Sequence, residues 1–340
     1  MIGSELPPAR RLVGIDVGGT KSLGVTMSPT RDPANARALE VTVEKRLLTP
    51  RGDGSADDLI DTLAALARSL CGDLDPSGNA EAVSVGIGVP GLVHRGGRLR
   101  AAPNLDGVAD LEIAERVGER LGTRVWVDND ATCAALAEWQ LGVAAGCRDV
   151  VLVTLGTGIG GGLVAGGRLQ HGVNGYAGEF GHMVINPDGP RCPCGRRGCW
   201  ERYASGSGLA MLAREAATGR RLRAVVELAD GDPRAVRGEH VQAAARNGDP
   251  EALAVVDDFA RYVAIGLSNL TNALDPEMFV LGGGLAAGAD IYLAPIERWF
   301  RELLYQPHLR TLPQIAFSEW GELSGAVGAS LLPLVDDARR

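Results

Sequence analysis

The sequence predicts an α/β protein with two lobes, and three observations lead to this prediction. Apolar runs of strand length alternate along the chain with segments of helical periodicity, which indicates layered α/β architecture. A strand, a glycine turn and a second strand open the chain near Leu12, and the same unit returns near Asp149. A length of 340 residues also exceeds the roughly 150 residues of one typical domain. Each lobe is therefore expected to present one glycine turn, and two such turns could hold one ligand.

The first half begins with a β-hairpin. Leu12–Val17 and Ser22–Met27 are apolar runs around the turn Asp16-Val-Gly-Gly-Thr-Lys21. A third strand is expected over Val41–Leu47. Ala56–Leu70 has leucines at helical spacing and predicts an amphipathic helix. The other elements expected in this half are a strand over Ala82–Val89, a helix over Leu111–Leu121, a strand over Arg124–Val127 and a helix that ends near residue 140.

The second half begins like the first, with strands expected over Asp149–Leu155 and Ile159–Ala165. They flank the turn Gly156-Thr157-Gly158. A loop-rich insertion follows over Gly166–Gly208, and after it the chain becomes helical. The last elements expected are a helix over Glu251–Ala273, a strand over Met278–Leu281 that runs into Gly282-Gly283-Gly284, and a helix over Glu322–Leu332 that Pro333 should end.

Composition and charge exclude several classes of protein. Hydrophobic residues make up 45% and charged residues 22% of the chain, which is typical of a globular protein. With 34 Lys and Arg against 42 Asp and Glu, the net charge is −8, and no basic face for nucleic acid is expected. No apolar run approaches the ~18 to 20 residues of a membrane helix, and Met1–Arg11 lacks the apolar core of a signal peptide. The sequence therefore predicts a cytoplasmic protein without nucleic-acid or membrane partners.

The two glycine turns are candidate phosphate sites. Gly18 and Gly19 let the backbone approach an anion closely, and Thr20 and Lys21 add hydrogen-bond donors. Neither turn has the Gly-x-x-x-x-Gly-Lys-Ser/Thr pattern of a Walker A loop. A tight hairpin without a ligand is the alternative for the first turn taken alone. The second turn, Gly156-Thr157-Gly158, favours nucleotide phosphates.

The segment Asp128-Asn129-Asp130 joins a strand to a helix, which is where α/β sheets position ligands. One of the three residues is expected to cap the helix, but three in succession exceed what a cap requires. A carboxylate here could accept the proton of a hydroxyl group as that group attacks phosphorus. Asp130 is the candidate general base, and Asn129 is a candidate substrate ligand.

A further cluster has the composition of a metal site. Cys192, Cys194 and Cys199 lie within eight residues and follow His182. One imidazole and three thiolates form a closed tetrahedral set, which is typical of structural zinc and leaves no open position for catalysis. The alternative is an accidental group of cysteines in a loop.

Two glutamates and four further histidines complete the candidates. Glu179 and Glu201 flank the cysteine loop and would become fixed acceptors for sugar hydroxyls if a metal anchors that loop. The remaining histidines are expected to be surface residues without partners: His94, His171, His240 and His308.

Taken together, these motifs resemble those of the ROK family of sugar kinases, and within it the bacterial ATP-dependent glucokinases. The similarity runs from the first expected strand to the last expected helix. Asp16–Lys21 and Leu155–Gly162 are similar to the two phosphate loops of the family, and Asn129-Asp130-Ala131 to its catalytic-base motif. Gly178–Met183 and Cys192–Glu201 are similar to its two-part signature.

The resemblance implies an actin-like ATPase fold, which is a duplicated, ribonuclease H-like architecture with the active site in the cleft between two lobes. The small lobe would span residues 11–128 and be completed by 322–338. The large lobe would span 129–321 and contain a zinc-binding loop at 182–199. The resemblance also implies ATP with Mg²⁺ as the phosphoryl donor, a hexose (glucose) as the acceptor, and a homodimer.

The resemblance assigns roles to single residues. Asp130 would take the proton from the sugar 6-hydroxyl, and Asp16 would reach the metal of MgATP through water. One nitrogen of His182 would bind zinc while the other faces the sugar. The implied sugar site comprises Gly91, Asn104, Asn129, Asp130, Glu179, His182 and Glu201. The implied nucleotide site comprises Asp16, Gly18, Gly19, Thr20, Lys21, Gly156, Thr157, Gly158 and, beside the adenosine, Gly282, Gly283 and Gly284.

One departure from the family pattern concerns the rim of the sugar site. Val108 stands four residues after Asn104, where many glucokinases of this family have tryptophan. N-acetylhexosamines and fructose are the alternative substrates. The family also contains sugar-sensing regulators with a DNA-binding domain ahead of the first glycine loop, whereas only Met1–Arg11 precede the first strand here. The sequence leaves open whether polyphosphate can replace ATP.

Overall fold

The computed structural model describes residues 11–29, 39–52, 55–71, 83–102, 104–105, 107–218 and 221–337. The chain forms two compact units. The first comprises the chain up to Arg148, the segment Gly162–Gly178 and the chain from Glu322 onward. The second comprises Asp149–Gly161 and Glu179–Gly321. No helix in these described ranges is both long enough and apolar enough to cross a membrane.

The first unit is built on a five-stranded sheet with the strand order β3-β2-β1-β4-β8. Its strands are β1 (Arg11–Val17), β2 (Lys21–Pro29), β3 (Leu39–Leu48), β4 (Val83–Val89) and β8 (Val125–Asn129). β1 and β2 form the expected antiparallel hairpin, whereas β1, β4 and β8 run parallel. Asp16 lies opposite Gly88, and Gly88 lies opposite Asp128. The ends of β1 and β8 therefore lie at one edge of the sheet, with only β4 between them.

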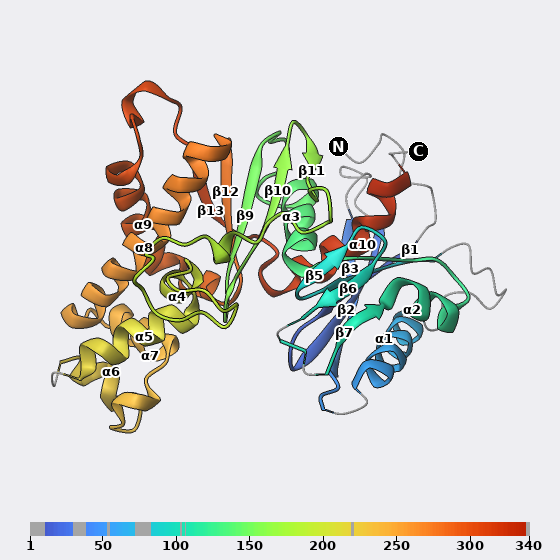
Figure 1. The fold of residues 1–340 in the computed structure, drawn as a ribbon, viewed down its shortest axis with the longest axis horizontal. Coiled ribbons are helices and arrows are strands. Elements are labelled where there is room, and N and C mark those ends of the chain that lie inside the picture. Colours follow the sequence, from blue (N-terminus) through green and yellow to red (C-terminus); the bar gives the residue numbers. More distant parts are fainter. Residues whose placement is uncertain are drawn as a thin grey trace. The chain divides into compact units, whose positions relative to one another are not determined.

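Helices cover both faces of this sheet (Figure 1). Helix α1 (Ser55–Cys71) packs on the face that carries Val13 and Ile15. Helix α10 (Ser324–Asp337) packs on the opposite face and against α3 (Asp130–Leu141). Gly14 and Gly86 permit this close approach, because a Cβ added at Gly86 would lie 1.8 Å from the carbonyl oxygen of Ala329.

A small antiparallel sheet and one helix complete the first unit. The sheet contains β5 (Leu92–His94), β6 (Arg98–Ala101) and β7 (Ala109–Glu112), and α2 (Ile113–Leu121) follows it. The predicted helix therefore begins two residues later than expected, because Leu111 pairs with Leu99 in the sheet.

The prediction that Pro333 ends the last helix is wrong, because α10 continues beyond it. A proline removes the N–H that would bond to the carbonyl four residues earlier. Here that carbonyl belongs to Ala329 and is packed against Gly86. Leu332 and Leu334 are buried, so the packing of this last turn offsets the missing hydrogen bond.

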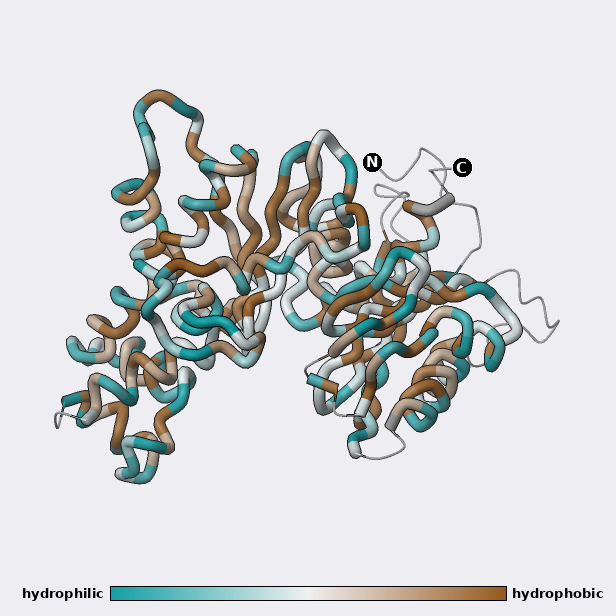
Figure 2. The backbone as a smooth tube through the Cα atoms, in the orientation of Figure 1, coloured by the Kyte–Doolittle hydropathy of each residue, from teal (hydrophilic) through white to brown (hydrophobic). Residues whose placement is uncertain are grey.

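The second unit contains most of another five-stranded sheet, with the order β11-β10-β9-β12-β13. Its strands are β9 (Val150–Leu155), β10 (Ile159–Ala165), β11 (Arg168–Leu169), β12 (Met278–Gly282) and β13 (Gln314–Phe317). The boundary between the units falls within β10. β12 runs parallel to both β9 and β13. β9 and β12 are nearly continuous hydrophobic runs (Figure 2), as expected of strands buried on both faces.

Helices make up much of the rest of the second unit. They are α4 (Glu201–Ala204), α5 (Gly206–Ala217), α6 (Arg223–Glu227), α7 (Gly238–Arg246), α8 (Pro250–Leu274) and α9 (Ala289–Leu303). The long helix α8 packs against α4, α5, α7 and α9. It ends where the sequence predicts, since Asp275 adopts a left-handed conformation immediately before Pro276.

The observed units differ from the expected lobes at α3. The resemblance places the chain from residue 129 in the large lobe, but α3 packs against α10 and β4 and belongs to the first unit. The segment Gly162–Gly178 also belongs to the first unit. Gly162 packs on α3 so closely that an added Cβ would lie 2.4 Å from the Cβ of Ala135.

Candidate active site

The first glycine turn connects β1 to β2 and is held by the residues that follow β3. The N–H of Gly18 donates to the carbonyl of Lys21 at 3.0 Å, which closes the turn. Thr49 donates its hydroxyl to the Gly18 carbonyl at 2.8 Å and its N–H to the Thr20 carbonyl at 2.9 Å. The side chains of Thr20 and Lys21 are exposed, so they are available to an anion as the sequence predicts.

Arg51 is a residue of this turn that sequence reasoning missed. Its Nε donates to the Gly19 carbonyl at 2.8 Å, and its Nη2 donates to the Thr20 hydroxyl at 2.9 Å. Asn104 lies at the same place, since a Cβ added at Gly19 would be 3.1 Å from the Asn104 carbonyl oxygen. The fold thus places one predicted sugar ligand beside the predicted phosphate turn.

Two carboxyl groups at the edge of the first sheet have raised pKa values. Burial, reinforced by the charge of Asp130, raises the pKa of Asp16 to about 7. Burial also raises the pKa of Asp130, although the N–H of Ala131 opposes this shift by donating to its carboxylate at 2.8 Å. A carboxylate with a raised pKa is a better proton acceptor than an ordinary one, which suits a general base. Desolvation and mutual repulsion act together at this edge.

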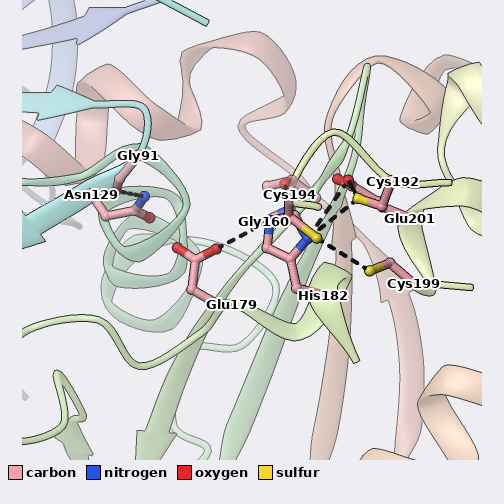
Figure 3. Close-up of polar contacts among 10 residues, drawn as sticks. Gly91, Asn129, Gly160, Glu179, His182, Cys192, Cys194, Cys199 and Glu201 are labelled. Atoms are coloured by element: carbon pink, nitrogen blue, oxygen red, sulfur yellow. Dashed lines mark hydrogen bonds and ion pairs between the residues drawn. The ribbon is translucent and has the colours of Figure 1, made fainter. Parts of the chain in front are cut away.

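Asn129 is the residue that caps α3, so the predicted cap is confirmed. Its Oδ1 accepts the N–H of Thr132 at 3.0 Å. Its Nδ2 donates to the Gly91 carbonyl at 3.1 Å, which links the strand end to the turn after β4 (Figure 3). Gly91, Asn129 and Asp130 therefore form one local group.

The prediction that His171 is a surface residue without a partner is wrong. Its Nε2 lies 2.6 Å from Oδ2 of Asp128, and only 17% of the His171 side chain and 10% of the Asp128 side chain are exposed. The two residues are 43 positions apart in the chain, so no local pattern in the sequence could have indicated this pair.

The second glycine turn lies against the start of α5. The N–H of Gly156 donates to the Gly158 carbonyl at 3.0 Å, and the N–H of Gly206 donates to the Gly156 carbonyl at 2.7 Å. The hydroxyl of Ser207 donates to the Thr157 carbonyl at 2.8 Å. The turn therefore adjoins a helix N-terminus, where the helix dipole favours an anion.

The glycines after β12 lie next to the same turn. β12 and β9 pair in register, with Gly282 opposite Thr154. Gly283 has a φ of +81°, and a Cβ there would lie 2.8 Å from the carbonyl carbon of Leu155. Only glycine fits both the conformation and the space. The predicted adenosine segment and the predicted phosphate turn are thus neighbours in the second unit.

The four predicted metal ligands come together. The ligand atoms of His182, Cys192, Cys194 and Cys199 all lie within 4.8 Å of one another. Sγ of Cys194 is 3.5 Å from Sγ of Cys199, and Sγ of Cys192 is 3.8 Å from Nδ1 of His182. Two thiolates on a tetrahedral zinc would be roughly 3.8 Å apart, given zinc–sulfur bonds of about 2.3 Å. The donor set therefore fits zinc in both chemistry and spacing.

The metal loop is anchored by a side chain that the sequence prediction overlooked. Trp200 follows the last cysteine, is fully buried and donates its indole N–H to the Tyr262 carbonyl of α8 at 2.8 Å. Gly266 of α8 leaves room for the ring, since an added Cβ would lie 1.9 Å from it. The loop is therefore fixed to the longest helix of the unit.

The two predicted acceptors flank the imidazole of His182 (Figure 3). Oε1 of Glu201 lies 3.7 Å from Nδ1, and Oε2 of Glu179 lies 3.8 Å from Nε2. Glu201 also accepts from Sγ of Cys192 at 2.9 Å. Nδ1 thus faces the sulfur cluster and Nε2 faces Glu179. A Cβ added at Gly158 would lie 2.8 Å from the Glu201 carboxylate, so this group adjoins the second glycine turn.

Val108 does not line an open rim. Its side chain is 5% exposed and belongs to the hydrophobic core of the first unit, together with Leu105 and Leu111. Val108 is therefore a core residue of the first unit.

Each unit thus holds one part of the predicted site. The first unit brings together the first glycine turn, Asp16, Gly91, Asn104, Asn129 and Asp130. The second unit brings together the second glycine turn, the glycines after β12, the four metal ligands, Glu179 and Glu201.

Comparisons with known proteins agree with this geometry. A model of the ROK family matches residues 12–335. The chain is 35% identical over 321 residues to the glucokinase of Streptomyces coelicolor, covering 94% of this chain and 96% of that one. It is also 35% identical over 337 residues to the N-acetyl-D-glucosamine kinase of Pectobacterium carotovorum, covering 95% and 99% of the two chains. Among solved structures, it is similar to a ROK family glucokinase from Streptomyces griseus in complex with glucose and AMPPNP, with a TM-score of 0.80, 33% identity and 95% and 98% coverage.

The fold class that follows is the two-lobed, actin-like ATPase fold, as the sequence predicts. This chain belongs to the ROK family.

Proposed function

We propose that this protein is a glucokinase, which transfers the γ-phosphoryl group of ATP to the 6-hydroxyl of glucose. The observation that carries the proposal is the carboxylate pair at the edge of the first sheet, where Asp130 begins α3 and Asp16 lies one residue before the end of β1. The Streptomyces coelicolor relative is a glucokinase, and the similar Streptomyces griseus structure holds glucose and an ATP analogue. These likenesses support glucose and ATP as the substrates.

Asp130 acts as the general base. Burial raises its pKa, so its carboxylate has a strong affinity for the proton that the 6-hydroxyl releases as its oxygen attacks phosphorus. The N–H of Ala131 fixes one carboxylate oxygen at 2.8 Å. The bond that forms joins the sugar oxygen to phosphorus, the bond that breaks releases ADP, and the proton passes to Asp130.

Thr20, Lys21 and the backbone groups of the glycine turns are the groups that we propose for binding the nucleotide. Asp16 suits a Mg²⁺ ion, since Mg²⁺ is commonly bound by one or two carboxylates together with substrate phosphates. Burial and the charge of Asp130 raise the pKa of Asp16 to about 7, and a cation bound beside it would favour the ionised carboxylate. Bound Mg²⁺ supplies positive charge that neutralises the phosphate oxygens.

The sugar is bound by polar groups from two places. Asn104, Asn129 and the backbone at Gly91 supply one set. Glu179, His182 and Glu201 are the proposed second set, and Nε2 of His182 lies 3.8 Å from Oε2 of Glu179. Zinc, held by His182, Cys192, Cys194 and Cys199, has a structural role, because four protein ligands leave no open position.

An N-acetylhexosamine kinase is the second candidate, and one comparison favours it. The N-acetyl-D-glucosamine kinase of Pectobacterium carotovorum matches as large a share of the chain at the same identity. Glucose is the first candidate, because the similar Streptomyces griseus structure is a ROK family glucokinase in complex with glucose. The family resemblance further predicts a homodimer, which size-exclusion chromatography with light scattering would test.

A coupled assay of ADP release over a panel of sugars tests the function directly. The panel contains glucose, mannose, fructose, N-acetylglucosamine and N-acetylmannosamine, with polyphosphate as a second donor for glucose. We expect kcat/KM for glucose to exceed that for fructose and both N-acetyl sugars by at least about tenfold, on the order of 1.4 kcal/mol. A higher kcat/KM for N-acetylglucosamine than for glucose would show that the protein is an N-acetylhexosamine kinase, the second candidate. An absence of turnover with every sugar would overturn the kinase proposal.

A further inference from the structure

Asp128 and His171 form a buried pair that the proposed reaction does not use. Nε2 of His171 is 2.6 Å from Oδ2 of Asp128, and both side chains are largely shielded from water. A hydrogen bond with a charged acceptor is shorter and stronger than a neutral one, and burial strengthens it further. Such a pair resists displacement of either partner.

The second oxygen of Asp128 connects this pair to the start of α3. Oδ1 of Asp128 accepts the N–H of Asn129 at 2.8 Å. Asn129 in turn accepts from Thr132 and donates to the Gly91 carbonyl. Asp130 is the next residue along the chain. The Asp128 carboxylate therefore holds the backbone at the point from which the proposed base projects.

His171 is itself fixed within the first unit. Its carbonyl accepts the N–H of Ala177 at 3.1 Å, which closes the loop that it begins. Arg95 donates its Nε to the Gly172 carbonyl at 2.9 Å. Gly175 has a φ of +96°, and a Cβ there would lie 2.6 Å from the Val93 carbonyl oxygen. The loop thus lies tightly against the chain around β5 and gives the imidazole a firm support.

Packing alone does not hold the pair. Asp128 and His171 both line a cavity of about 530 Å³, together with Arg95, Arg124 and Trp126. They also line a smaller cavity of about 110 Å³. Open space therefore lies beside both side chains, and the hydrogen bond between them is a contact that holds them in place.

We propose that His171 is a positioning residue for Asp130, acting through Asp128 and the turn into α3. The proposal rests on the proposed function, in which Asp130 accepts the proton. A base displaced by even 1 Å can cost about a hundredfold in rate, so losing the hydrogen bond should lower turnover even though His171 touches no substrate.

Three variants test the proposal. His171→Leu keeps the bulk but removes the donor, and we expect kcat to fall about tenfold or more with an unchanged KM for ATP. His171→Gln places an amide donor where Nε2 lies and should recover most of the lost kcat. His94→Leu is the control, since His94 lines the same small cavity, and its kcat should stay within about twofold of the parent.

Coupling and hydrogen exchange distinguish positioning from general destabilisation. Asp128→Asn should lower kcat like His171→Leu, and the double variant should be no worse than either single one, because both remove the same link. Amide exchange at the first turn of α3 should rise in His171→Leu and not in His94→Leu. If His171→Leu does not fold, Asp128→Asn carries the same comparisons.

Three results would overturn the proposal: a folded His171→Leu enzyme with more than half of the parent kcat, no recovery in His171→Gln, or additive losses in the double variant. A parent enzyme that phosphorylates no sugar would instead overturn the proposed function, while the exchange measurement would still test the positioning of α3.

Discussion

Asp130 and Asp16 show how a single carboxyl group takes its chemistry from its position. Both are ordinary aspartates in the sequence, and both acquire raised pKa values because the fold buries them at one edge of the sheet, Asp16 near the end of β1 and Asp130 directly after β8. Desolvation makes each of them costly to ionise. This cost lowers the folding stability, but it also raises the affinity of each carboxylate for a proton. Stability and catalysis are separate measurements, so the two effects can be tested one at a time.

Asp130→Asn should keep the fold and nearly abolish turnover. The amide has the size of the carboxylate and can still accept the N–H of Ala131, but it cannot take up a proton. General-base catalysis contributes ~10² to 10⁴-fold, so kcat should fall at least about a hundredfold while glucose still binds. Steady-state kinetics together with calorimetric glucose binding measure both quantities. A variant that keeps half of the parent kcat would show that Asp130 is not the general base.

Asp16→Asn should stabilise the protein in a pH-dependent way. Unfolded Asp16 ionises near pH 4, whereas the folded residue ionises near pH 7. Between these values the folded state holds a proton that the unfolded state has released, so the stability of the parent falls as pH rises toward 7. The Tm gain of the variant should therefore grow from pH 4 to 7 and level off above 7, in buffer without magnesium or nucleotide.

An exposed carboxylate provides the control for that series. Asp58→Asn on α1, where the side chain is exposed, is measured over the same pH series so that the effect of a buried site can be separated from the loss of a carboxylate. A Tm difference for Asp16→Asn that does not vary with pH would contradict the raised pKa. Activity of Asp16→Asn should fall as well, since the variant loses the proposed Mg²⁺ ligand.

At the scale of elements, the metal loop is a short segment with little regular structure of its own. The chain from His182 to Glu201 contains turns and isolated bridges, and Trp200 fixes only its end to α8. Three of its four donor atoms come from within eight residues. Zinc would therefore join four side chains of this loop at one point, and the positions of Glu179, His182 and Glu201 would depend on it.

Cys192→Ser or Cys199→Ser should lower zinc content and weaken sugar binding. We expect about one zinc per chain in the parent protein and less than one in either variant. KM for glucose should rise more than KM for ATP, because the proposed sugar ligands flank the metal directly, whereas the first glycine turn belongs to the other unit. Elemental analysis and kinetics measure both, with Cys147→Ser as the control outside the metal set. Full activity in zinc-free parent protein would contradict the structural role.

The elements also show where sequence reasoning succeeds and where it fails. The β1–β2 hairpin, α8 and the four metal ligands follow from local patterns, because apolar periodicity, turn residues and close cysteine spacing are visible within short windows. The His171–Asp128 pair and the Arg51 brace depend on residues that tertiary structure brings together. The prediction that the last helix ends at Pro333 fails for the same reason, because burial against the sheet outweighs the local effect of the proline.

On the scale of the whole molecule, the first unit is assembled from separated parts of the chain. Its sheet comes from the first 129 residues, whereas α10, which covers one face of that sheet, begins at Ser324. Gly14 and Gly86 leave room for this helix, because a Cβ added at either position would collide with residues of α10. The first unit is therefore incomplete without the end of the chain.

Truncation after Leu323 should prevent the first unit from folding stably. Removing α10 exposes the apolar face that it covers and leaves α3 without its main partner. We expect aggregation, or loss of the cooperative unfolding transition in calorimetry. Glu322→Ala is the matched control, because this carboxylate is 76% exposed and forms a surface ion pair with Arg46 at 3.1 Å, and such pairs contribute about 1 kcal/mol at most. A truncated chain that melts like the parent would contradict the dependence on α10.

The late position of α10 also has a consequence during synthesis. About 195 residues separate the end of β8 from the start of α10, and at roughly 5 to 20 residues per second a ribosome needs about 10 to 40 s to make them. During that interval the strands of the first unit have been synthesised, but the apolar face that α10 covers remains exposed while the second unit is being synthesised. The nascent chain is therefore expected to be prone to aggregation. The yield of folded protein in a cell should depend on chaperones that bind exposed apolar surface.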